Sequence, residues 1–142
     1  AMDLYDPASG ARIQQSGTFN ANPIAMVAGY KTLQMLTAEA YAQMGRLAEK
    51  AAEGLRAAFS EAGIAAQVVV AGSMFRIFFL DRAPRNFREA ANDDGQLQRW
   101  LFFALLNRGI YTRVGGNVSL VTEEGHVDTL VQGVREVLKA LG

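Results

Sequence analysis

The stretch Gln67-Val68-Val69-Val70-Ala71-Gly72-Ser73-Met74-Phe75-Arg76-Ile77-Phe78-Phe79-Leu80 decides the fold. The β-branched run 67–70 is typical of a strand, and so is the apolar run 74–80, in which Arg76 is the one charged residue. Gly72 and Ser73 between the two runs predict a turn or a bulge. Because this connection is so short, we expect the two strands to pair antiparallel.

Downstream of this hairpin the sequence predicts a helix and two more strands. Asp94 is the expected cap of a helix that runs to about residue 107. Segments 110–112 and 117–121 are expected to be strands, and Gly115-Gly116 predicts a tight turn between them.

Thr122 is the expected cap of a last helix with an apolar stripe over 127–141. From residue 64 onward the predicted order is strand, strand, helix, strand, strand, helix. Short connections between strands favour an α+β fold, in which an antiparallel sheet of about four strands carries helices on one face.

A long helical pattern precedes the sheet. Asn22 before Pro23 is typical of a helix start, and apolar residues recur at helical spacing over 24–59. We expect a break near 36–38 and an end at Gly63. The pattern is more apolar than a surface helix needs, so part of it should pack against something outside this chain.

Composition excludes several classes of function. The chain has 142 residues, a formal net charge of +0, one histidine and no cysteine. Disulfides, thiolate metal sites and cysteine nucleophiles are therefore excluded, and charge neutrality argues against a general nucleic-acid binder. No apolar run approaches the roughly 20 residues that span a bilayer, and no signal peptide is visible. We expect a cytoplasmic protein.

The polar segment 12–22 has two interpretations. The loop Ser16-Gly17-Thr18-Phe19-Asn20 stands before a helix start, where backbone N–H groups and the helix dipole can hold a phosphate. The alternative interpretation is a polar loop with a helix cap. The phosphate signal is weak by itself, because no Walker lysine or GxGxxG spacing is present. Residues 1–22 have few apolar side chains, so we expect them to be mobile or held by another copy.

Other polar residues have simple structural interpretations. His126 belongs to the last helix and is more typical of a surface position than of a catalytic one. Asp93-Asp94 suits a helix cap better than an acid/base pair. Arg76, inside an apolar strand, either faces solvent or pairs with an anion. Lys31, Lys50 and Lys139 all lie on helical patterns, where nothing desolvates an amine for Schiff-base chemistry.

Four segments together resemble one enzyme family. Residues 15–29 resemble the GTFxxNPxAMxAG motif of class-III pyridoxal-phosphate-dependent aminotransferases. Gly72-Ser73-Met74-Phe75, followed by Phe78-Phe79, is similar to the GSMFxxFF strand of the glutamate-1-semialdehyde 2,1-aminomutases in that family. Residues 107–111 resemble their xRGVY turn, and 119–141 resemble their carboxyl end. The resemblance covers nearly the whole chain.

This resemblance implies a fold and a domain organisation. The chain is similar to the C-terminal part of a fold-type-I enzyme, with an α+β small domain over 37–142 preceded by a long helix. Residues 1–36, a loop plus a helix, would be a remnant of the large cofactor domain and of the dimer interface. The family's catalytic lysine lies upstream of the GTF segment, so no catalytic residue is expected in this chain, which alone would be inactive.

The resemblance also implies a cofactor and partners. Pyridoxal 5′-phosphate would serve as electron sink while an amino group moves through an external aldimine. Gly17 and Thr18 match the position that contacts the cofactor phosphate of the partner subunit, across a homodimer interface formed by 12–36. The substrate would be a small amino acid or amine, and no metal, nucleic acid or membrane partner is expected.

One segment departs from the aminomutase pattern. Aminomutases usually carry a longer segment with a glutamate after the RGVY turn, whereas here it is only Thr112-Arg113-Val114-Gly115-Gly116-Asn117. The reaction therefore stays open between an aminomutase and a transaminase of another amino acid or amine. Arg113 is a candidate contact for a substrate carboxylate. The alternative is that it is a solvated loop residue. The alternative function is a non-catalytic α+β domain that binds a partner through 12–36.

Overall fold

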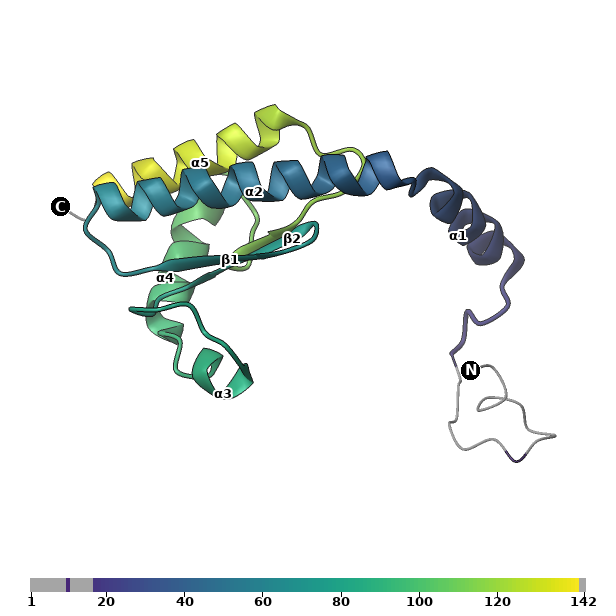
Figure 1. Cartoon of the computed structure of the whole chain (residues 1–142), viewed down its shortest axis with the longest axis horizontal. Helices are drawn as coiled ribbons and strands as arrows, with labels where there is room; N and C mark the ends of the chain where they lie inside the picture. The colour runs from purple at the N-terminus through teal and green to yellow at the C-terminus, as the bar shows by residue number, and fades with distance from the viewer. Residues whose placement is uncertain (1–9, 11–16, 141–142) are drawn as a thin grey trace. The chain divides into compact units, whose positions relative to one another are not determined.

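The computed structural model describes Gly10 and residues 17–140 (Figure 1). It divides the chain into two compact units, residues 1–36 and 37–142. The expected behaviour of 1–22 falls largely on residues 1–9 and 11–16, which lie outside the described residues.

In the first unit, helix α1 (Pro23–Met35) begins where the sequence predicts. Asn22 Oδ1 accepts hydrogen bonds from the backbone N–H groups of Ile24 at 3.0 Å and Ala25 at 3.2 Å. This confirms the predicted cap, which satisfies two of the free N–H groups of the first turn. No residue of α1 is buried.

Helix α2 (Ala38–Glu61) opens the second unit. Its cap is Thr37, whose hydroxyl oxygen accepts a hydrogen bond from the N–H of Ala40 at 3.2 Å. The predicted break at 36–38 is therefore confirmed. Beyond α2, Gly63 adopts a φ of 68°, the left-handed conformation that ends many helices.

The sheet has three antiparallel strands in the order β1 (Gln67–Ala71), β2 (Met74–Phe78) and β3 (Gly115–Asn117). The predicted hairpin is confirmed, with Val69 opposite Arg76 and Gly72 at a φ of 60° in the turn.

The prediction for the third part of the sheet is wrong in its placement. Residues 110–112 form no strand, and 115–116 are strand rather than turn, so the sheet has three strands instead of about four. The reason is steric: a Cβ on Gly116 would lie 2.6 Å from the Phe75 ring, and one on Gly115 would lie 2.5 Å from the Phe75 carbonyl oxygen. These glycines let β3 lie close to β2. Of the predicted strand 117–121, only Asn117 belongs to β3.

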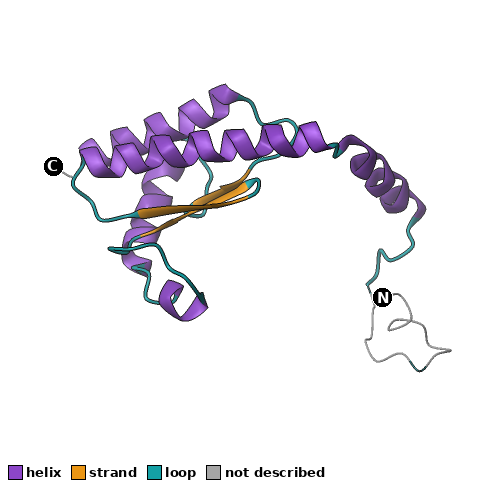
Figure 2. Cartoon of the chain, in the orientation of Figure 1, coloured by secondary structure: helices purple, strands orange, loops and turns teal. Residues whose placement is uncertain are grey.

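Three more helices complete the second unit: α3 (Phe87–Ala90), α4 (Gly95–Leu106) and α5 (Glu124–Lys139). Helices α2 and α5 run side by side in the same direction on one side of the sheet (Figures 1 and 2). A Cβ on Gly54 would lie 2.7 Å from Val131 Cγ2, so the glycine allows their close approach. Lys50 pairs with Glu124 at 2.8 Å and Glu61 with Arg135 at 3.4 Å across the same interface.

The cap of α5 also differs from the prediction. The cap residue is Glu123, and its N–H donates to Nδ1 of His126 at 3.0 Å. Thr122 instead closes the preceding turn, where its hydroxyl oxygen accepts from the N–H of Ser119 at 3.0 Å. Both residue types can cap a helix, so the sequence alone does not choose between neighbouring positions.

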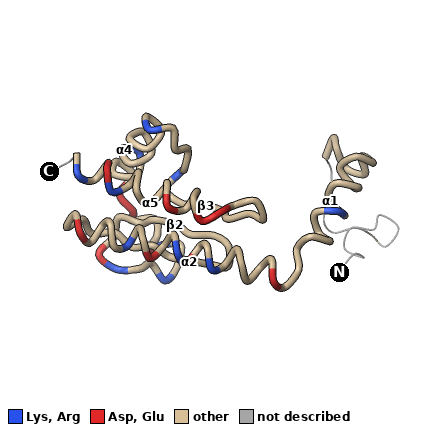
Figure 3. The backbone as a smooth tube through the Cα atoms, turned by 90° about the horizontal axis from the view of Figure 1, so that it is seen from above, with Lys and Arg blue, Asp and Glu red and all other residues tan. Residues whose placement is uncertain are grey.

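The core lies where the sheet meets α2, α4 and α5. Its largest fully buried side chains are Leu55, Phe59, Ile77, Leu101, Leu105, Val134 and Val137. Acidic and basic residues alternate over the second unit, whereas the only charged residue in α1 is Lys31 (Figure 3). Over residues 17–140, none of the helices combines the length and hydropathy of a membrane span.

Candidate functional site

The turn before α1 contains both predicted phosphate contacts, Gly17 and Thr18. The carbonyl of Gly17 accepts a hydrogen bond from the N–H of Asn20 at 3.0 Å, and a Cβ on Gly17 would lie 2.9 Å from Asn20 Oδ1. A side chain at position 17 would therefore displace Asn20 from the turn. Thr18 is exposed.

A hydroxyl and peptide N–H groups next to a helix start are suitable phosphate ligands. No lysine or arginine occurs between Gly17 and Tyr30, so the positive charge for such a site would have to come from elsewhere. The turn fits one wall of a phosphate site.

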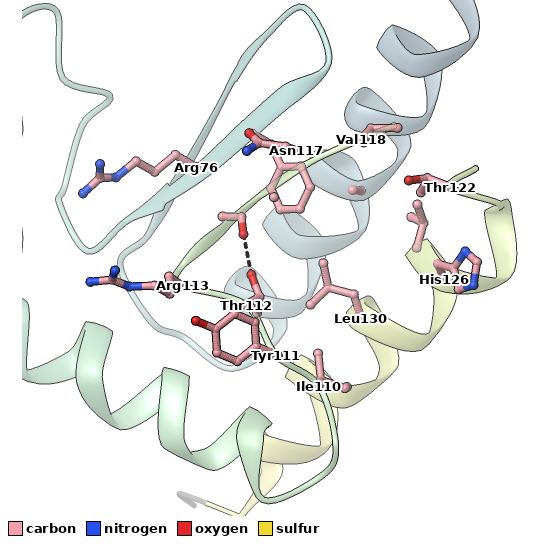
Figure 4. Close-up of a pocket in the computed structure, with 15 residues that line it drawn as sticks. Arg76, Ile110, Tyr111, Thr112, Arg113, Asn117, Val118, Thr122, His126 and Leu130 are labelled. Carbon is pink, nitrogen blue, oxygen red and sulfur yellow. Dashed lines mark hydrogen bonds between the residues drawn. The ribbon is translucent and has the colours of Figure 1, made fainter. Parts of the chain in front are cut away.

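A second candidate is a pocket of about 610 Å³ in the second unit, which we call the helix-side pocket (Figure 4). It opens between β2, β3 and the first turns of α5, and its lining includes Phe75, Ile110, Thr112, His126, Val127 and Leu130. Thr112 donates its hydroxyl to the carbonyl oxygen of Gly115, which holds the segment before β3 in place.

Arg113, the predicted substrate contact, lies at the rim of the helix-side pocket with Arg76. Figure 4 shows both side chains extending to the same side, away from His126 and Leu130. Both residues are exposed. Arg113 therefore offers its guanidinium to a ligand outside the helix-side pocket rather than to one deep inside it.

Two candidates weighed in the sequence have structural roles. Nδ1 of His126 is occupied by the N–H of Glu123, so this ring nitrogen caps α5. Asp93 Oδ1 accepts the N–H of Phe79 at 2.8 Å, and Asp94 Oδ1 accepts the N–H of Gln96 at 2.8 Å. Asp94 thus caps α4 as predicted, whereas Asp93 is not part of the cap and anchors its loop to Phe79.

The lysines show no sign of activation for covalent chemistry. Lys50 Nζ lies 2.8 Å from Glu124 Oε2 and 3.0 Å from Asp128 Oδ1. The hydrogen bonds that Lys50 donates to these two carboxylates raise its pKa above the ordinary value of 10.5, which keeps the amine protonated. Lys31 and Lys139 are exposed on helices, where nothing desolvates the amine for Schiff-base chemistry.

Comparison with known proteins identifies the relatives of this chain. A glutamate-1-semialdehyde 2,1-aminomutase of Methanothermobacter thermautotrophicus is 31% identical over 99% of the chain. An omega-transaminase from Sphaerobacter thermophilus matches 99% of the chain with a TM-score of 0.82 and 30% identity. A transaminase with PLP bound matches 99% of the chain with a TM-score of 0.77 and 30% identity.

The chain is homologous to the C-terminal part of class-III aminotransferases. It spans 34% of the length of the aminomutase, and 34% and 32% of the two transaminases. No protein-family model matches it. Both names, aminomutase and transaminase, occur among these class-III relatives, as the sequence motifs predicted.

Sequence reasoning missed a second cavity of the same unit. We call it the arginine pocket; it has a volume of about 680 Å³ and is lined by Arg76, Gln98, Arg99, Phe102, Phe103, Tyr111, Arg113 and Val114. Its residues come from β2, α4 and the segment before β3. Three arginines without an acidic neighbour among these residues were the available signal, but their spacing in sequence does not show that they meet.

Proposed function

We propose that the complete protein is a pyridoxal-phosphate-dependent enzyme that transfers amino groups. The observation that carries this proposal is the match over 99% of the chain to both an aminomutase and a transaminase, at 31% and 30% identity. The neighbour with PLP bound supports the choice of cofactor. Because the chain spans about a third of these relatives, the remaining parts of the site would come from outside it.

In this proposal Gly17 and Thr18 hold the cofactor phosphate of a partner subunit. The cofactor supplies an electron sink for the carbon that carries the amino group. The Thr18 hydroxyl and the Gly17 N–H donate to phosphate oxygens, and the glycine keeps the turn compact around Asn20.

The matched test replaces one of two exposed threonines in the complete protein. Thr18→Ala is expected to raise the dissociation constant of pyridoxal phosphate about tenfold, since a hydrogen bond to a charged group contributes about 1.5 kcal/mol or more. Thr129→Ala, which removes an exposed hydroxyl that donates to the Gly125 carbonyl and lies outside residues 12–36, is the control. Equal affinities in the two variants, measured by absorbance titration, would overturn the assignment.

The lysine that binds the cofactor lies outside this chain in our proposal. Lys50 is held by two carboxylates, and Lys31 and Lys139 are solvated. After the complete protein has been treated with pyridoxal phosphate and reduced with borohydride, peptide mapping should place the label on another lysine. Stoichiometric label on any of these three would contradict the proposal.

We favour a transaminase over an aminomutase. The segment 112–117 has no acidic residue and its end is strand β3, packed closely on Phe75. Arg113 is available for a substrate carboxylate. Arg113→Gln in the complete protein should raise KM for a carboxylate-bearing amine with a smaller effect on kcat, and Arg88→Gln should change neither. Conversion of glutamate 1-semialdehyde as the best substrate would instead support the aminomutase.

We also propose a homodimer through residues 12–36. Helix α1 is apolar around its circumference, and such helices are normally buried. Sedimentation equilibrium of the 142-residue chain should show dimers or larger species, and the double change Tyr30→Lys and Leu33→Lys should weaken them. A monomer at high protein concentration would overturn this. If the complete protein assembles but does not bind the cofactor, that result would support the non-catalytic alternative. A cytoplasmic location stays a prediction.

A further inference from the structure

The arginine pocket differs from the rest of the surface in its charge. Three of its residues are arginines, and none of its lining residues is acidic. Elsewhere in the second unit, most arginines are in ion pairs with glutamates: Arg56, Arg82, Arg85, Arg108 and Arg135. Among the described residues, Arg76, Arg99 and Arg113 form no such pair.

The backbone fixes two of these arginines side by side. Arg76 pairs with Gly115 across β2 and β3, and the N–H of Ile77 donates to the carbonyl of Val114 at 2.8 Å. Val114 is buried and has a φ of 54°, so the chain is constrained directly after Arg113. Figure 4 shows both guanidinium groups on the same side. The Arg76 guanidinium lies 5.0 Å from the centroid of the Phe78 ring. Two guanidinium groups on one side repel each other, and an anion between them relieves this repulsion.

The third arginine comes from α4 and is held in position. Arg99 Nε donates to the carbonyl of Gly95 at 3.2 Å, one turn earlier in the helix. The bond leaves its terminal amino groups available to a ligand. Arg99 lines only the arginine pocket, whereas Arg76 and Arg113 also line the helix-side pocket.

Aromatic rings form the other wall. Phe102 contacts Phe103 at a centroid distance of 5.1 Å and Tyr111 at 5.8 Å, both edge to face. Phe103 is 57% exposed and Tyr111 is 74% exposed, so both rings still have free surface. Aromatic rings prefer such geometry with one another, and a third ring can extend the cluster.

We propose that the arginine pocket binds a small aromatic carboxylate. The carboxylate lies between the guanidinium groups of Arg76, Arg99 and Arg113, and the ring packs on Phe103 and Tyr111. Guanidinium matches the planar carboxylate geometry, and the rings exclude water from one side of the ligand. The site lies wholly within residues 76–114. Because Arg113 is also the proposed contact for the substrate carboxylate, this inference rests on the proposed function and names an aromatic carboxylate as the ligand there.

The test is a titration of the 142-residue chain with benzoate at low salt, followed through NMR amide shifts of residues 99–103 and 111–114. We expect saturable binding in the millimolar range, typical of a ligand of this size. Benzamide has the same ring without the charge and should bind at least tenfold more weakly. Inorganic phosphate has charge without a ring and should also bind more weakly.

Arg99→Gln is the decisive variant because Arg99 lines only this pocket. It should weaken benzoate binding about tenfold, the effect of losing one hydrogen bond to a charged group. Arg88→Gln removes an equal charge from exposed α3 and should leave binding unchanged. Phe103→Leu is the second variant because Phe103 also lines only this pocket. Melting temperatures equal to that of the parent would verify that the variants fold.

Four results would overturn the proposal. If benzamide bound as tightly as benzoate, the ring alone would account for the affinity. If phosphate bound as tightly as benzoate, the charge alone would account for it. Full benzoate binding in Arg99→Gln would show that the ligand does not occupy the arginine pocket. Absence of any saturable shift would show that the arginine pocket does not bind an aromatic carboxylate. Because benzoate binding needs no cofactor, these results test the ligand of the pocket, whereas amino-group transfer is tested separately with the complete protein.

Discussion

Helices α1 and α2 are both rich in apolar residues, yet only α2 belongs to a core. In α1, Ile24 is 81% exposed and Leu33 is 70% exposed, and no residue of the helix is buried. In α2, Leu55 and Phe59 are almost fully buried. Helix α2 collects its apolar residues on one face, whereas α1 spreads them around its circumference. A high content of apolar residues is therefore not enough to bury a helix in a core. The apolar residues must also lie on one face, as they do in α2.

The largest expected difference between the two helices is in core substitutions. Phe59→Ala removes a ring that packs edge to face on Phe79 at 5.7 Å and should lower the free energy of unfolding of residues 37–140 by about 3–5 kcal/mol. Ile24→Ala in α1 should change it by less than about 0.5 kcal/mol. Urea denaturation checks both, and similar losses would show that α1 contributes to the core.

A second comparison uses two glycines of the helix pair. Gly54→Ala places a methyl group 2.7 Å from Val131 Cγ2 and should destabilise the second unit by about 1–3 kcal/mol. Gly125→Ala, in the first turn of α5 with open space around it, should stabilise by about 0.5–1 kcal/mol. Thermal melts of both variants would measure the difference, and a stabilising Gly54→Ala would mean that α2 and α5 are not in close contact.

Helix caps give a smaller effect. Asp94→Ala removes the side chain that caps α4 and should lower the stability of the second unit by about 1 kcal/mol. Asn22→Ala removes the corresponding cap of α1 and should leave the melting transition of 37–140 unchanged. A decrease of the same size in both variants, seen in urea curves, would contradict the independence of the two units.

The smallest expected effect is the alkaline pH dependence from Lys50. The hydrogen bonds that Lys50 donates to Glu124 and Asp128 raise its folded pKa above 10.5. This interaction therefore stabilises the fold below that pH, and its contribution is lost as pH rises through the folded pKa. The melting temperature of Lys50→Met should therefore lie below that of the parent at pH 8, and the gap should close above pH 10.5. Lys139→Met is the control, and a gap that widens with pH would contradict the assignment.

Local signals in the sequence predicted the parts of the fold that local chemistry decides. Asn22 and Asp94 cap the helices that were predicted to begin there, and Thr37 caps α2 at the predicted break near 36–38. The turn at Gly72 joins the predicted hairpin. The third strand was misplaced because Gly115 usually marks a turn. Here it is needed for close approach to Phe75, a residue far away in the sequence.

The candidate sites show the same limit. Gly17, Thr18 and Arg113 were singled out from a family resemblance, and the exposed turn and rim where they lie are compatible with those roles. The arginine pocket was not predicted, because it needs Arg99 of α4 to meet Arg76 and Arg113. Such a meeting depends on tertiary packing, which residue spacing does not encode.

The parallel pairing of α2 with α5 has a consequence for folding kinetics. Lys50 and Glu124 are separated by 74 positions along the chain, so the helix pair is a contact of high order. The β1–β2 hairpin can close early, within microseconds in typical hairpins. The apolar face of α2, in contrast, has no helical partner until residues 124–138 have left the ribosome. During synthesis this face is the surface for which a chaperone would compete.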